Sequence, residues 1–333
     1  MMQRIAIIGA GGWGTALSIV LARNVEQVSL WVYEPDLCER LRTTRINDLY
    51  LPGSSLPENV VPSTDLSEVL ADAEVVFTVV PADYLRSVCQ QMAPLAGPEQ
   101  IFVSATKGLE SRTLLRMSEV ITETLEARFR PKLAVLSGPT FSREVARGLP
   151  TAVTIASADE ALARQLQHRF ANSTFRFYTN TDVVGVELGG ALKNVIAIAA
   201  GVCEGLNLGS NAVAALVTRG LAEIIRLACA YGARRETLTG LAGLGDLVLT
   251  CTGVLSRNRR VGVELGRGRT LAEILESMRM VAEGISTTAS AVEMARRKGV
   301  EMPIAAQMYA VLYENRSPLD AVRELMERRL KAE

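Results

Sequence analysis

The first 180 residues alternate short apolar runs with stretches of helical periodicity. The apolar, β-branched runs predict strands near 4–8, 27–33, 75–80, 101–105, 133–137 and 152–156. The periodic stretches predict helices near 15–23, 83–92, 111–127 and 159–170. Because strands and helices alternate, we expect an α/β fold with a doubly wound parallel sheet.

The pattern changes after residue 180. All the segments with clear periodicity are now helical, and no convincing strand intervenes; they are 184–204, 211–231, 270–277, 287–298, 304–313 and 318–330. We therefore expect two domains, a doubly wound domain over residues 1–182 and an all-helical domain over residues 183–333. A short linker predicts close packing, with the active site between them.

The first predicted strand ends in a cluster of glycines. Gly9, Gly11 and Gly14 form the pattern G-x-G-x-x-G between a strand and a helix. In this pattern the first glycine permits a tight turn, the second lets the backbone approach a pyrophosphate, and the third lets the helix pack on the strand. A second strand follows, as the fingerprint requires, so the segment predicts a dinucleotide site in a Rossmann-type domain.

An acidic residue, Glu34, ends the second predicted strand. A carboxylate there can accept hydrogen bonds from the adenine ribose and repels a 2′-phosphate, which favours NAD over NADP. Tyr33 could stack on the adenine. Arg40 and Arg42 could instead serve a phosphorylated ribose, and Glu34 could be a solvated loop charge, so both alternatives stay open.

Composition excludes several classes of protein. The chain has 333 residues, of which 48% are hydrophobic, enough for two buried cores. Its 36 basic and 36 acidic residues cancel, so no global field favours nucleic acid or an anionic membrane. The five cysteines are scattered without a C-x-x-C pair, which indicates reduced thiols and an intracellular protein; they are Cys38, Cys89, Cys203, Cys229 and Cys251.

Neither a signal peptide nor a membrane span is expected. The chain enters a strand within a few residues, and the most apolar run, Val195–Cys203, is too short to cross a bilayer. We therefore expect a cytoplasmic protein, and we expect no metal.

The single histidine, His168, lies in a stretch that predicts a surface helix. A dinucleotide that transfers a hydride needs a proton donor or acceptor beside it, and His168 is poorly placed for that role. Lysine, aspartate or glutamate must therefore provide it.

Lys193 is the strongest candidate. Its neighbours are small or apolar, including Gly189, Gly190 and Ala191, so its ammonium is either buried or directed into a cleft. A desolvated lysine loses its proton more readily, which suits a general acid or base at neutral pH. The alternative is a surface lysine that snorkels to water.

A glycine-rich run surrounds Asp246 and predicts a shaped loop, not a helix interior. Asp246 could orient Lys193 or accept a substrate hydroxyl. Arg257 and Asn258 offer donors for a phosphate or carboxylate. Arg259–Arg260 are predicted to form a solvated basic turn.

Three strand ends complete the predicted cleft, because ligands bind beyond the carboxyl ends of such strands. They are Val79–Pro81, Thr106–Gly108 and Ser137–Thr140. Lys107 adds a second cation. Gly138 and Thr140 are expected to open a helix whose backbone N–H groups contact an anion.

Together these motifs resemble the bacterial NAD(P)-dependent glycerol-3-phosphate dehydrogenases. The resemblance runs nearly end to end, and the stretch from Leu241 to Gly253 with Ser256–Arg260 is its most specific part. It implies a Rossmann domain, a helical domain like that of 6-phosphogluconate dehydrogenase, and a homodimer. The implied activity interconverts dihydroxyacetone phosphate and sn-glycerol 3-phosphate for phospholipid synthesis.

By position, the resemblance also implies roles for individual residues. Lys193 is similar to the proton-transfer lysine, with Asp246, Lys107 and Asn194 beside it. The implied substrate contacts are Lys107, Gly138, Thr140, Lys193, Asp246, Ser256, Arg257 and Asn258. The implied cofactor contacts, besides Gly9, Gly11, Gly14 and Glu34, are Gly12, Trp13, Tyr33, Lys107, Ser142, Arg257, Val281 and Glu283.

The chain departs from the family pattern in two cofactor positions. Gly12 stands where the family usually has a hydroxyl or amide side chain, and Ser142 where it usually has alanine. Val32–Glu34 also lacks an arginine pair that some members carry, which agrees with the preference for NAD.

Two other readings compete with this one. A related two-domain β-hydroxyacid or ketone reductase would use a carboxylate substrate. A nucleotide-sensing binding protein would share the fold without catalysis.

Overall fold

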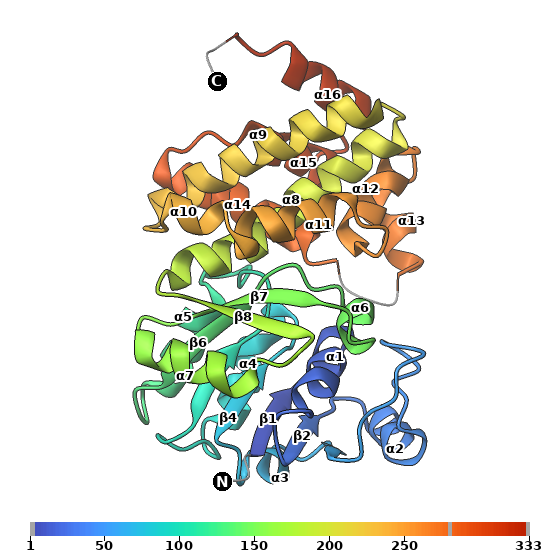
Figure 1. Ribbon diagram of the computed structural model, residues 1–333. Coiled ribbons are helices and arrows are strands. Elements are labelled where there is room, and N and C mark those ends of the chain that lie inside the picture. The colour runs from blue at the N-terminus through green and yellow to red at the C-terminus, as the bar shows by residue number, and fades with distance from the viewer. Residues whose placement is uncertain (1–3, 279–281, 331–333) are drawn as a thin grey trace.

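The computed structural model describes residues 4–278 and 282–330. An α/β part lies below a helical part in Figure 1. The α/β part contains strands β1 (Arg4–Ile8), β2 (Gln27–Trp31), β3 (Val60–Ser63), β4 (Val75–Thr78), β5 (Ile101–Ser104), β6 (Lys132–Ser137), β7 (Thr151–Ala156) and β8 (Phe175–Asn180). Its helices are α1 (Gly12–Leu21), α2 (Pro35–Thr44), α3 (Leu66–Leu70), α4 (Ala82–Met92), α5 (Met117–Leu125), α6 (Ser142–Ala146) and α7 (Glu160–Phe170).

The strands form one sheet in the order β3-β2-β1-β4-β5-β6-β7-β8. The strand order reverses beside β1, so the predicted doubly wound α/β fold is confirmed. One part of the prediction is wrong, since β7 pairs antiparallel with β6 and the sheet is mixed. The connection between these two strands holds only the five-residue α6, and the chain turns back instead of crossing the sheet.

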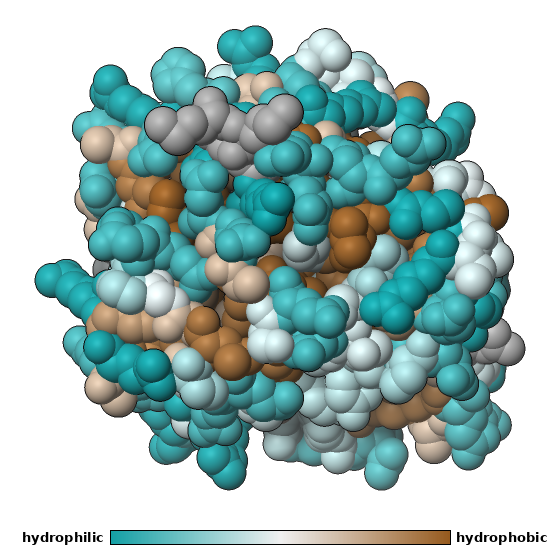
Figure 2. Space-filling model, turned by 90° about the horizontal axis from the view of Figure 1, so that it is seen from below, coloured by the Kyte–Doolittle hydropathy of each residue, from teal (hydrophilic) through white to brown (hydrophobic). Residues whose placement is uncertain are grey.

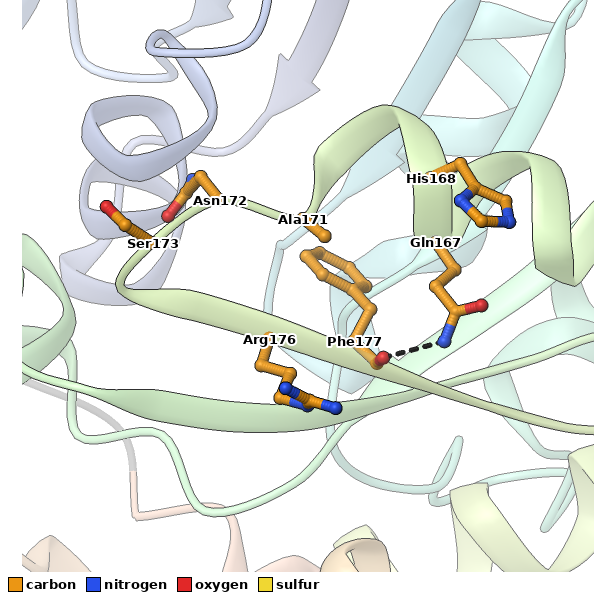
Figure 3. A pocket seen from close by; sticks show the side chains of 7 residues that line it. All are labelled: Gln167, His168, Ala171, Asn172, Ser173, Arg176 and Phe177. Atoms are coloured by element: carbon orange, nitrogen blue, oxygen red, sulfur yellow. Dashed lines mark hydrogen bonds between the residues drawn. The ribbon is translucent and has the colours of Figure 1, made fainter.

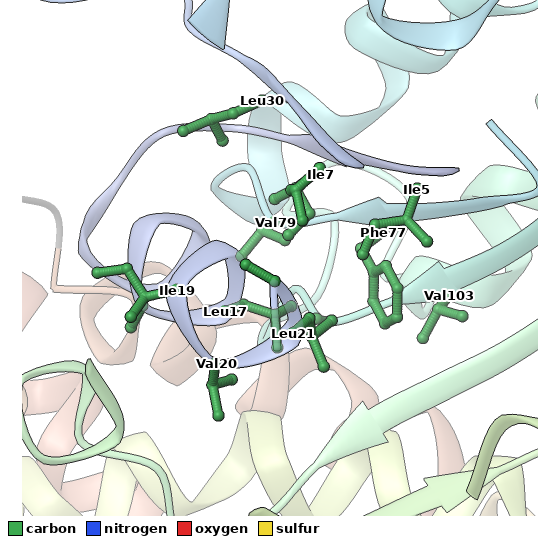
Figure 4. Close-up of a cluster of buried hydrophobic side chains, with 14 of the residues drawn as sticks. Ile5, Ile7, Leu17, Ile19, Val20, Leu21, Leu30, Phe77, Val79 and Val103 are labelled. Atoms are coloured by element: carbon green, nitrogen blue, oxygen red, sulfur yellow. The ribbon is translucent and has the colours of Figure 1, made fainter. Parts of the chain in front are cut away.

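The largest core of the α/β part lies between α1 and the sheet. Figure 4 shows Leu17 and Leu21 of α1 facing Ile5, Phe77 and Val103 of the strands. All five are fully buried. The alternation of side chains along each strand therefore directs one set toward this core and the other toward α4 and α5.

Helices make up the rest of the described chain, as predicted. They are α8 (Val183–Gly205), α9 (Gly209–Ala230), α10 (Arg235–Leu238), η1 (Leu241–Gly245), α11 (Asp246–Thr252), α12 (Arg257–Gly266), α13 (Leu271–Glu276), α14 (Gly284–Lys298), α15 (Pro303–Tyr313) and α16 (Pro318–Met326).

Helix α8 lies at the centre of this helical domain, and α9, α11, α12 and α14 pack around it. The closest crossing is with α12, where two glycines face the opposite backbone. A Cβ on Gly262 would lie 1.9 Å from the carbonyl oxygen of Ile198, and one on Gly201 would lie 2.0 Å from that of Arg259. The two backbones are therefore in contact, which fixes the start of α12 relative to α8.

The apolar run Val195–Cys203, expected to be too short to cross a bilayer, belongs to the longer helix α8. The helix that contains this run has 23 residues and is, by length and composition alone, long and apolar enough to cross a membrane. Of its most apolar stretch, 89% is buried inside the structure. This burial is what a core helix of a folded domain shows.

Three predicted elements differ from the structure. Arg259 and Arg260, predicted to form a solvated turn, lie inside α12, and Arg259 forms an ion pair with Glu204 of α8. The run around Asp246 is helical, because the π-helix η1 leads directly into α11 at that residue. Its glycines permit close backbone packing, since a Cβ on Gly243 would lie 2.0 Å from the carbonyl oxygen of Leu238. The helix predicted over 111–127 begins only at Met117, because Leu114 takes a left-handed conformation with φ of 66°.

The face of the α/β part that points away from the helical domain is mostly hydrophilic (Figure 2). Figure 2 shows the molecule from below, with hydrophobic residues in groups that hydrophilic residues interrupt. Such a mixture is usual for globular proteins.

Candidate active site

The glycine-rich loop joins β1 to α1, and α1 begins at Gly12, three residues earlier than predicted. Gly9 has a φ of 118°, which favours glycine, and a Cβ on Gly14 would lie 1.8 Å from the carbonyl oxygen of Gly9. Apart from Gly11 itself and its two chain neighbours, no heavy atom lies within 4 Å of a Cβ built on Gly11. The loop is therefore tightly turned and open at the place where a pyrophosphate needs to approach, so these residues fit a dinucleotide.

The other predicted cofactor residues of the α/β part lie around this loop. Trp13 is half-buried, and its indole N–H donates to the carbonyl oxygen of Ala105 at 3.1 Å. Ser142 is the first residue of α6, and its Oγ lies 3.8 Å from the Cβ position of Gly12. The two departures from the family pattern are therefore neighbours in space.

Tyr33 and Glu34 follow β2, at the carboxyl edge of the sheet. Tyr33 is 75% exposed, and Glu34 is the N-cap residue of α2. The Glu34 carboxylate accepts a hydrogen bond of 2.6 Å from the hydroxyl of Tyr50.

Two lysines share the carboxylate of Asp246. The Lys107 ammonium lies 2.8 Å from Oδ2, and the Lys193 ammonium contacts Oδ1. Asp246 and Lys193 are buried, while Lys107 is half-buried. The loop after β5, the middle of α8 and the start of α11 each contribute one of these side chains, so the cluster joins the α/β part to the helical domain.

Burial gives Lys193 an unusual acidity. Desolvation lowers its pKa from 10.5 to about 7, the negative charge of Asp246 opposes that change, and the positive charge of Lys107 adds to it. The ammonium donates a second hydrogen bond to Thr250 Oγ1 at 2.9 Å. With a pKa of about 7, both the ammonium and the neutral amine of Lys193 are populated near neutral pH.

Lys107 also ties the strand ends together. Its ammonium donates to the Gly138 carbonyl oxygen at 2.8 Å and to Thr140 Oγ1 at 3.1 Å. Gly138 has a φ of 143°. Both Gly138 and Thr140 precede α6, which starts at Ser142, so the expectation that they open a helix is wrong. They contribute a carbonyl and a hydroxyl instead of helix N–H groups.

A second polar group lies one residue further along α8. Asn258 donates from Nδ2 to Asn194 Oδ1 at 2.9 Å, and its Oδ1 accepts from the Gly284 backbone N–H at 2.9 Å. Ser256 is the N-cap of α12, and its hydroxyl accepts from the Arg259 N–H at 3.2 Å. Arg257 follows this cap and is exposed.

Glu283 connects α14 to the start of α4. Its carboxylate accepts a hydrogen bond from the backbone N–H of Ala82. Burial raises the pKa of Glu283 to about 7, while this hydrogen bond and the positive charge of Arg257 lower it. The positive charge of Arg257 therefore acts on Glu283. Val281, predicted as a further cofactor contact, lies outside the described residues.

Some residues that contact the candidate site residues are not predicted by the sequence. Thr250 lies four residues after Asp246 on α11, a helical spacing that could have identified it. Asn47 and Tyr50 contact the nucleotide loop and Glu34, and no local motif marks them. Glu187 lies on the same helix as Lys193, and no local motif indicates a partner for it.

Glu187 holds α8 against the α/β part. Its buried carboxylate accepts from the Ser118 backbone N–H at 2.8 Å, the Ser118 hydroxyl at 2.6 Å and the Arg116 guanidinium at 2.6 Å. It lies six residues before Lys193 on the same helix. The helix that carries Lys193 is therefore anchored to α5.

His168 is exposed on α7, as predicted. It lines a surface hollow with Gln167, Asn172, Arg176 and Phe177, in which Gln167 donates to the Phe177 carbonyl oxygen at 2.8 Å (Figure 3). This hollow lies at the edge strand β8 and includes none of the predicted site residues. All five cysteines are free, and no metal-binding group of three or more His, Cys, Asp or Glu occurs among the described residues.

The fold, the nucleotide loop and the buried lysine are those of a two-domain, nicotinamide-dependent dehydrogenase. Two family profiles match the chain: the N-terminal part of NAD-dependent glycerol-3-phosphate dehydrogenase over residues 4–163, and its C-terminal part over residues 182–323. The chain belongs to the NAD(P)-dependent glycerol-3-phosphate dehydrogenase family.

Individual relatives agree. The chain is 59% identical to a glycerol-3-phosphate dehydrogenase [NAD(P)+] of Koribacter versatilis, with 98% of each chain covered. It is 56% identical to that of Syntrophotalea carbinolica, with 99% of each covered. The crystal structure of glycerol-3-phosphate dehydrogenase from Coxiella burnetii has a TM-score of 0.92 at 43% identity, covering 98% of this chain and 99% of that one.

The competing ketone-reductase interpretation receives less support. A ketopantoate reductase from Ralstonia eutropha has a TM-score of 0.61 at 17% identity, covering 96% of this chain and all of that one. This likeness shows a shared fold alone.

Proposed function

We propose that this chain catalyses the reversible reduction of dihydroxyacetone phosphate to sn-glycerol 3-phosphate for glycerophospholipid synthesis. The observation that carries the proposal is the buried Lys193, whose ammonium is held between Asp246 and Thr250 next to Lys107. Lys193 offers a proton donor at the junction between the α/β part and the helical domain. The choice of dihydroxyacetone phosphate as the substrate rests on the family to which the chain belongs.

Lys193 acts as the proton donor in the reduction. A nicotinamide cofactor bound at the glycine-rich loop, with its pyrophosphate beside Gly11, would supply the hydride for the ketone carbon. Negative charge then develops on the ketone oxygen, and the Lys193 ammonium stabilises and protonates it. In the reverse direction the neutral amine takes the hydroxyl proton, and a pKa of about 7 lets the same group serve both directions.

Asp246 sets the geometry of this transfer. Oδ1 of Asp246 binds Lys193, and Oδ2 binds Lys107. The negative charge of Asp246 therefore offsets the repulsion between the two ammonium groups and keeps both in place. Asn194 is held in turn by Asn258. A preorganised site of this kind needs little rearrangement as charge develops.

Arg257 and Asn258 hold the phosphate of the substrate, and the other proposed substrate contacts, Lys107, Gly138, Thr140 and Ser256, line the site around it. Arg257 is exposed at the start of α12, where its guanidinium is available to an anion. Binding energy from the phosphate orients the carbonyl toward Lys193.

NAD is the preferred cofactor. Glu34 lies where the adenine ribose binds in such folds, and its carboxylate repels a 2′-phosphate. The two arginines that could accept that phosphate have other partners: Arg40 Nε lies 3.1 Å from Asp48, and Arg42 Nε lies 3.1 Å from the Pro62 carbonyl oxygen. Tyr33 stacks on the adenine. Gly9, Gly11, Gly12, Trp13, Gly14, Ser142 and Glu283 complete the cofactor contacts, with Val281 as an expectation from the family.

We also propose that residues 1–182 bind the cofactor and residues 183–333 bind the substrate. The protein is expected to act in the cytoplasm as a homodimer, in keeping with its family.

A spectrophotometric assay tests the reaction. The purified chain should oxidise NADH in the presence of dihydroxyacetone phosphate, and NADPH more slowly at equal concentration. Turnover of hydroxy acids or their keto forms without turnover of dihydroxyacetone phosphate would establish the reductase alternative. Tight NADH binding without turnover of any of these substrates would establish a nucleotide sensor.

A further inference from the structure

The segment after α2 is fixed to the glycine-rich loop by a fully buried asparagine. Asn47 donates from Nδ2 to the Ala10 carbonyl oxygen at 2.8 Å and to Thr15 Oγ1 at 2.7 Å. Its Oδ1 accepts the Tyr50 backbone N–H at 2.9 Å, and its backbone carbonyl accepts the Leu51 N–H at 3.0 Å. The backbone of Tyr50 therefore has a defined position relative to the loop.

Gly12 allows the close approach of this segment. A Cβ on Gly12 would lie 2.9 Å from the Tyr50 carbonyl oxygen. A side chain there would push the Tyr50 backbone away. Gly12, which departs from the family pattern, therefore makes room for the backbone of Tyr50.

From this position the Tyr50 side chain reaches across to the end of β2. Its hydroxyl donates to Glu34 Oε1 at 2.6 Å, and both residues are half-buried. Burial and the Glu34 carboxylate raise the pKa of Tyr50 to about 12, so its hydroxyl remains a proton donor at neutral pH. Because Tyr50 occupies Oε1, Oε2 is left as an acceptor.

A carboxylate fixed by a hydrogen bond distinguishes NAD from NADP better than a freely rotating one. A free glutamate side chain can rotate into solvent, away from a 2′-phosphate, and loses rotational freedom when it binds a ribose. A carboxylate held by Tyr50 cannot rotate away without breaking a hydrogen bond to a charged group. It is ordered before the nucleotide arrives, so it accepts a ribose hydroxyl at lower entropic cost.

We propose that Tyr50 is a positioning residue that sets the cofactor preference by holding Glu34 at the adenine ribose, which favours NAD and disfavours NADP. This inference rests on the cofactor preference proposed above. Tyr50 does not itself need to contact the nucleotide in this proposal, because it acts through Glu34. The two residues meet where the segment around Asn47 lies between the glycine-rich loop and the end of β2.

The test is a double-mutant cycle with Tyr50→Phe, Glu34→Ala and the double variant, each assayed with NADH and NADPH against dihydroxyacetone phosphate. Tyr50→Phe should lower the ratio of kcat/KM for NADH to that for NADPH by about fivefold or more, with the change falling mainly on KM. In the Glu34→Ala background the same substitution should leave the ratio unchanged. Tyr178→Phe, which removes an exposed tyrosine hydroxyl on β8, is the matched control.

A ratio unaltered by Tyr50→Phe, or one that falls equally with and without Glu34, would overturn the inference. So would a wild-type preference for NADPH. If the wild type turns over no dihydroxyacetone phosphate, the proposed function fails separately, and the cycle is then read from the Kd values of NADH and NADPH measured by fluorescence titration.

Discussion

The carboxylate of Asp246 lies 2.8 Å from the Lys107 ammonium, and its other oxygen holds the buried Lys193. One negative charge thus contacts two lysines, and the cluster has one net positive charge next to the strand ends while Lys193 is protonated. An acidic residue is therefore compatible with the anionic substrate proposed above, because Asp246 holds both lysines in place and leaves an excess positive charge.

Replacing Asp246 with asparagine should change the pH dependence of the reduction. The Asp246 charge raises the pKa of Lys193 against the effect of burial, so its loss lowers that pKa below about 7. Since the ammonium form donates the proton, kcat for ketone reduction should fall on the alkaline side of this pKa. In Asp246→Asn this fall should begin about one pH unit or more lower. Profiles of kcat between pH 5 and about 9 measure it.

The control for this profile is Asp72→Asn, which removes an exposed carboxylate paired with Arg4. It should leave the profile in place. An Asp246→Asn profile that coincides with the wild type would show that Asp246 does not set the acidity of the catalytic group.

Arg257→Ala should mainly raise KM for dihydroxyacetone phosphate. A guanidinium bound to a phosphate contributes about 1.5–3 kcal/mol, so KM should rise by about tenfold or more. Arg260→Ala, at an exposed position on the same helix, is the matched control. An unchanged KM in Arg257→Ala would remove this residue from the phosphate site.

The anchor between α8 and α5 predicts a difference in stability. Glu187→Ala removes a buried partner of Arg116 and Ser118, and breaking a buried ion pair costs about 3–5 kcal/mol. Urea denaturation should show this loss of unfolding free energy.

The matched control is Glu160→Ala, because Glu160 pairs with Arg164 on an exposed helix surface. Such pairs contribute about 0.5 kcal/mol. Equal effects of the two substitutions would contradict the role given to Glu187 as an anchor.

Backbone contact between α8 and α12 makes Gly262 intolerant of any side chain. An added Cβ would overlap the Ile198 carbonyl oxygen, so we expect the two helices to move apart and to weaken the hydrogen bond that joins them, from Asn258 to Asn194. Gly262→Ala should therefore lower the unfolding free energy by about 1–3 kcal/mol and raise KM for the substrate. Gly97→Ala is the control, because no heavy atom beyond Gly97 and its two chain neighbours lies within 4 Å of the added Cβ. It should change neither the unfolding free energy nor KM in the same assays.

Local patterns in the sequence were sufficient for part of this architecture. The glycine spacing around Gly9 and Gly14 has a direct geometric meaning, and an isolated lysine among small residues at Lys193 indicated burial. The reversed direction of β7 was not predictable, because it depends on how the short α6 connection turns. Nor was the Tyr50 contact with Glu34, since it joins residues 16 positions apart through a turn without a recognisable motif.

The glycine-rich run before Asp246 shows a different limit. Glycines usually indicate a loop, yet here they form a π-helix, because close packing against Leu238 and Gly189 replaces the side chains that a helix interior would normally carry. The tertiary contacts that favour this helix cannot be seen in a local pattern.

The central claim is that Lys193 transfers the proton during ketone reduction. The most direct test compares Lys193→Ala with the wild type in single-turnover oxidation of NADH by saturating dihydroxyacetone phosphate, with Lys132→Ala as an exposed-lysine control. Loss of a general acid should slow the step by about 10²–10⁴-fold while NADH still binds by fluorescence titration. A rate within a few fold of the wild type, with NADH bound, would contradict the assignment.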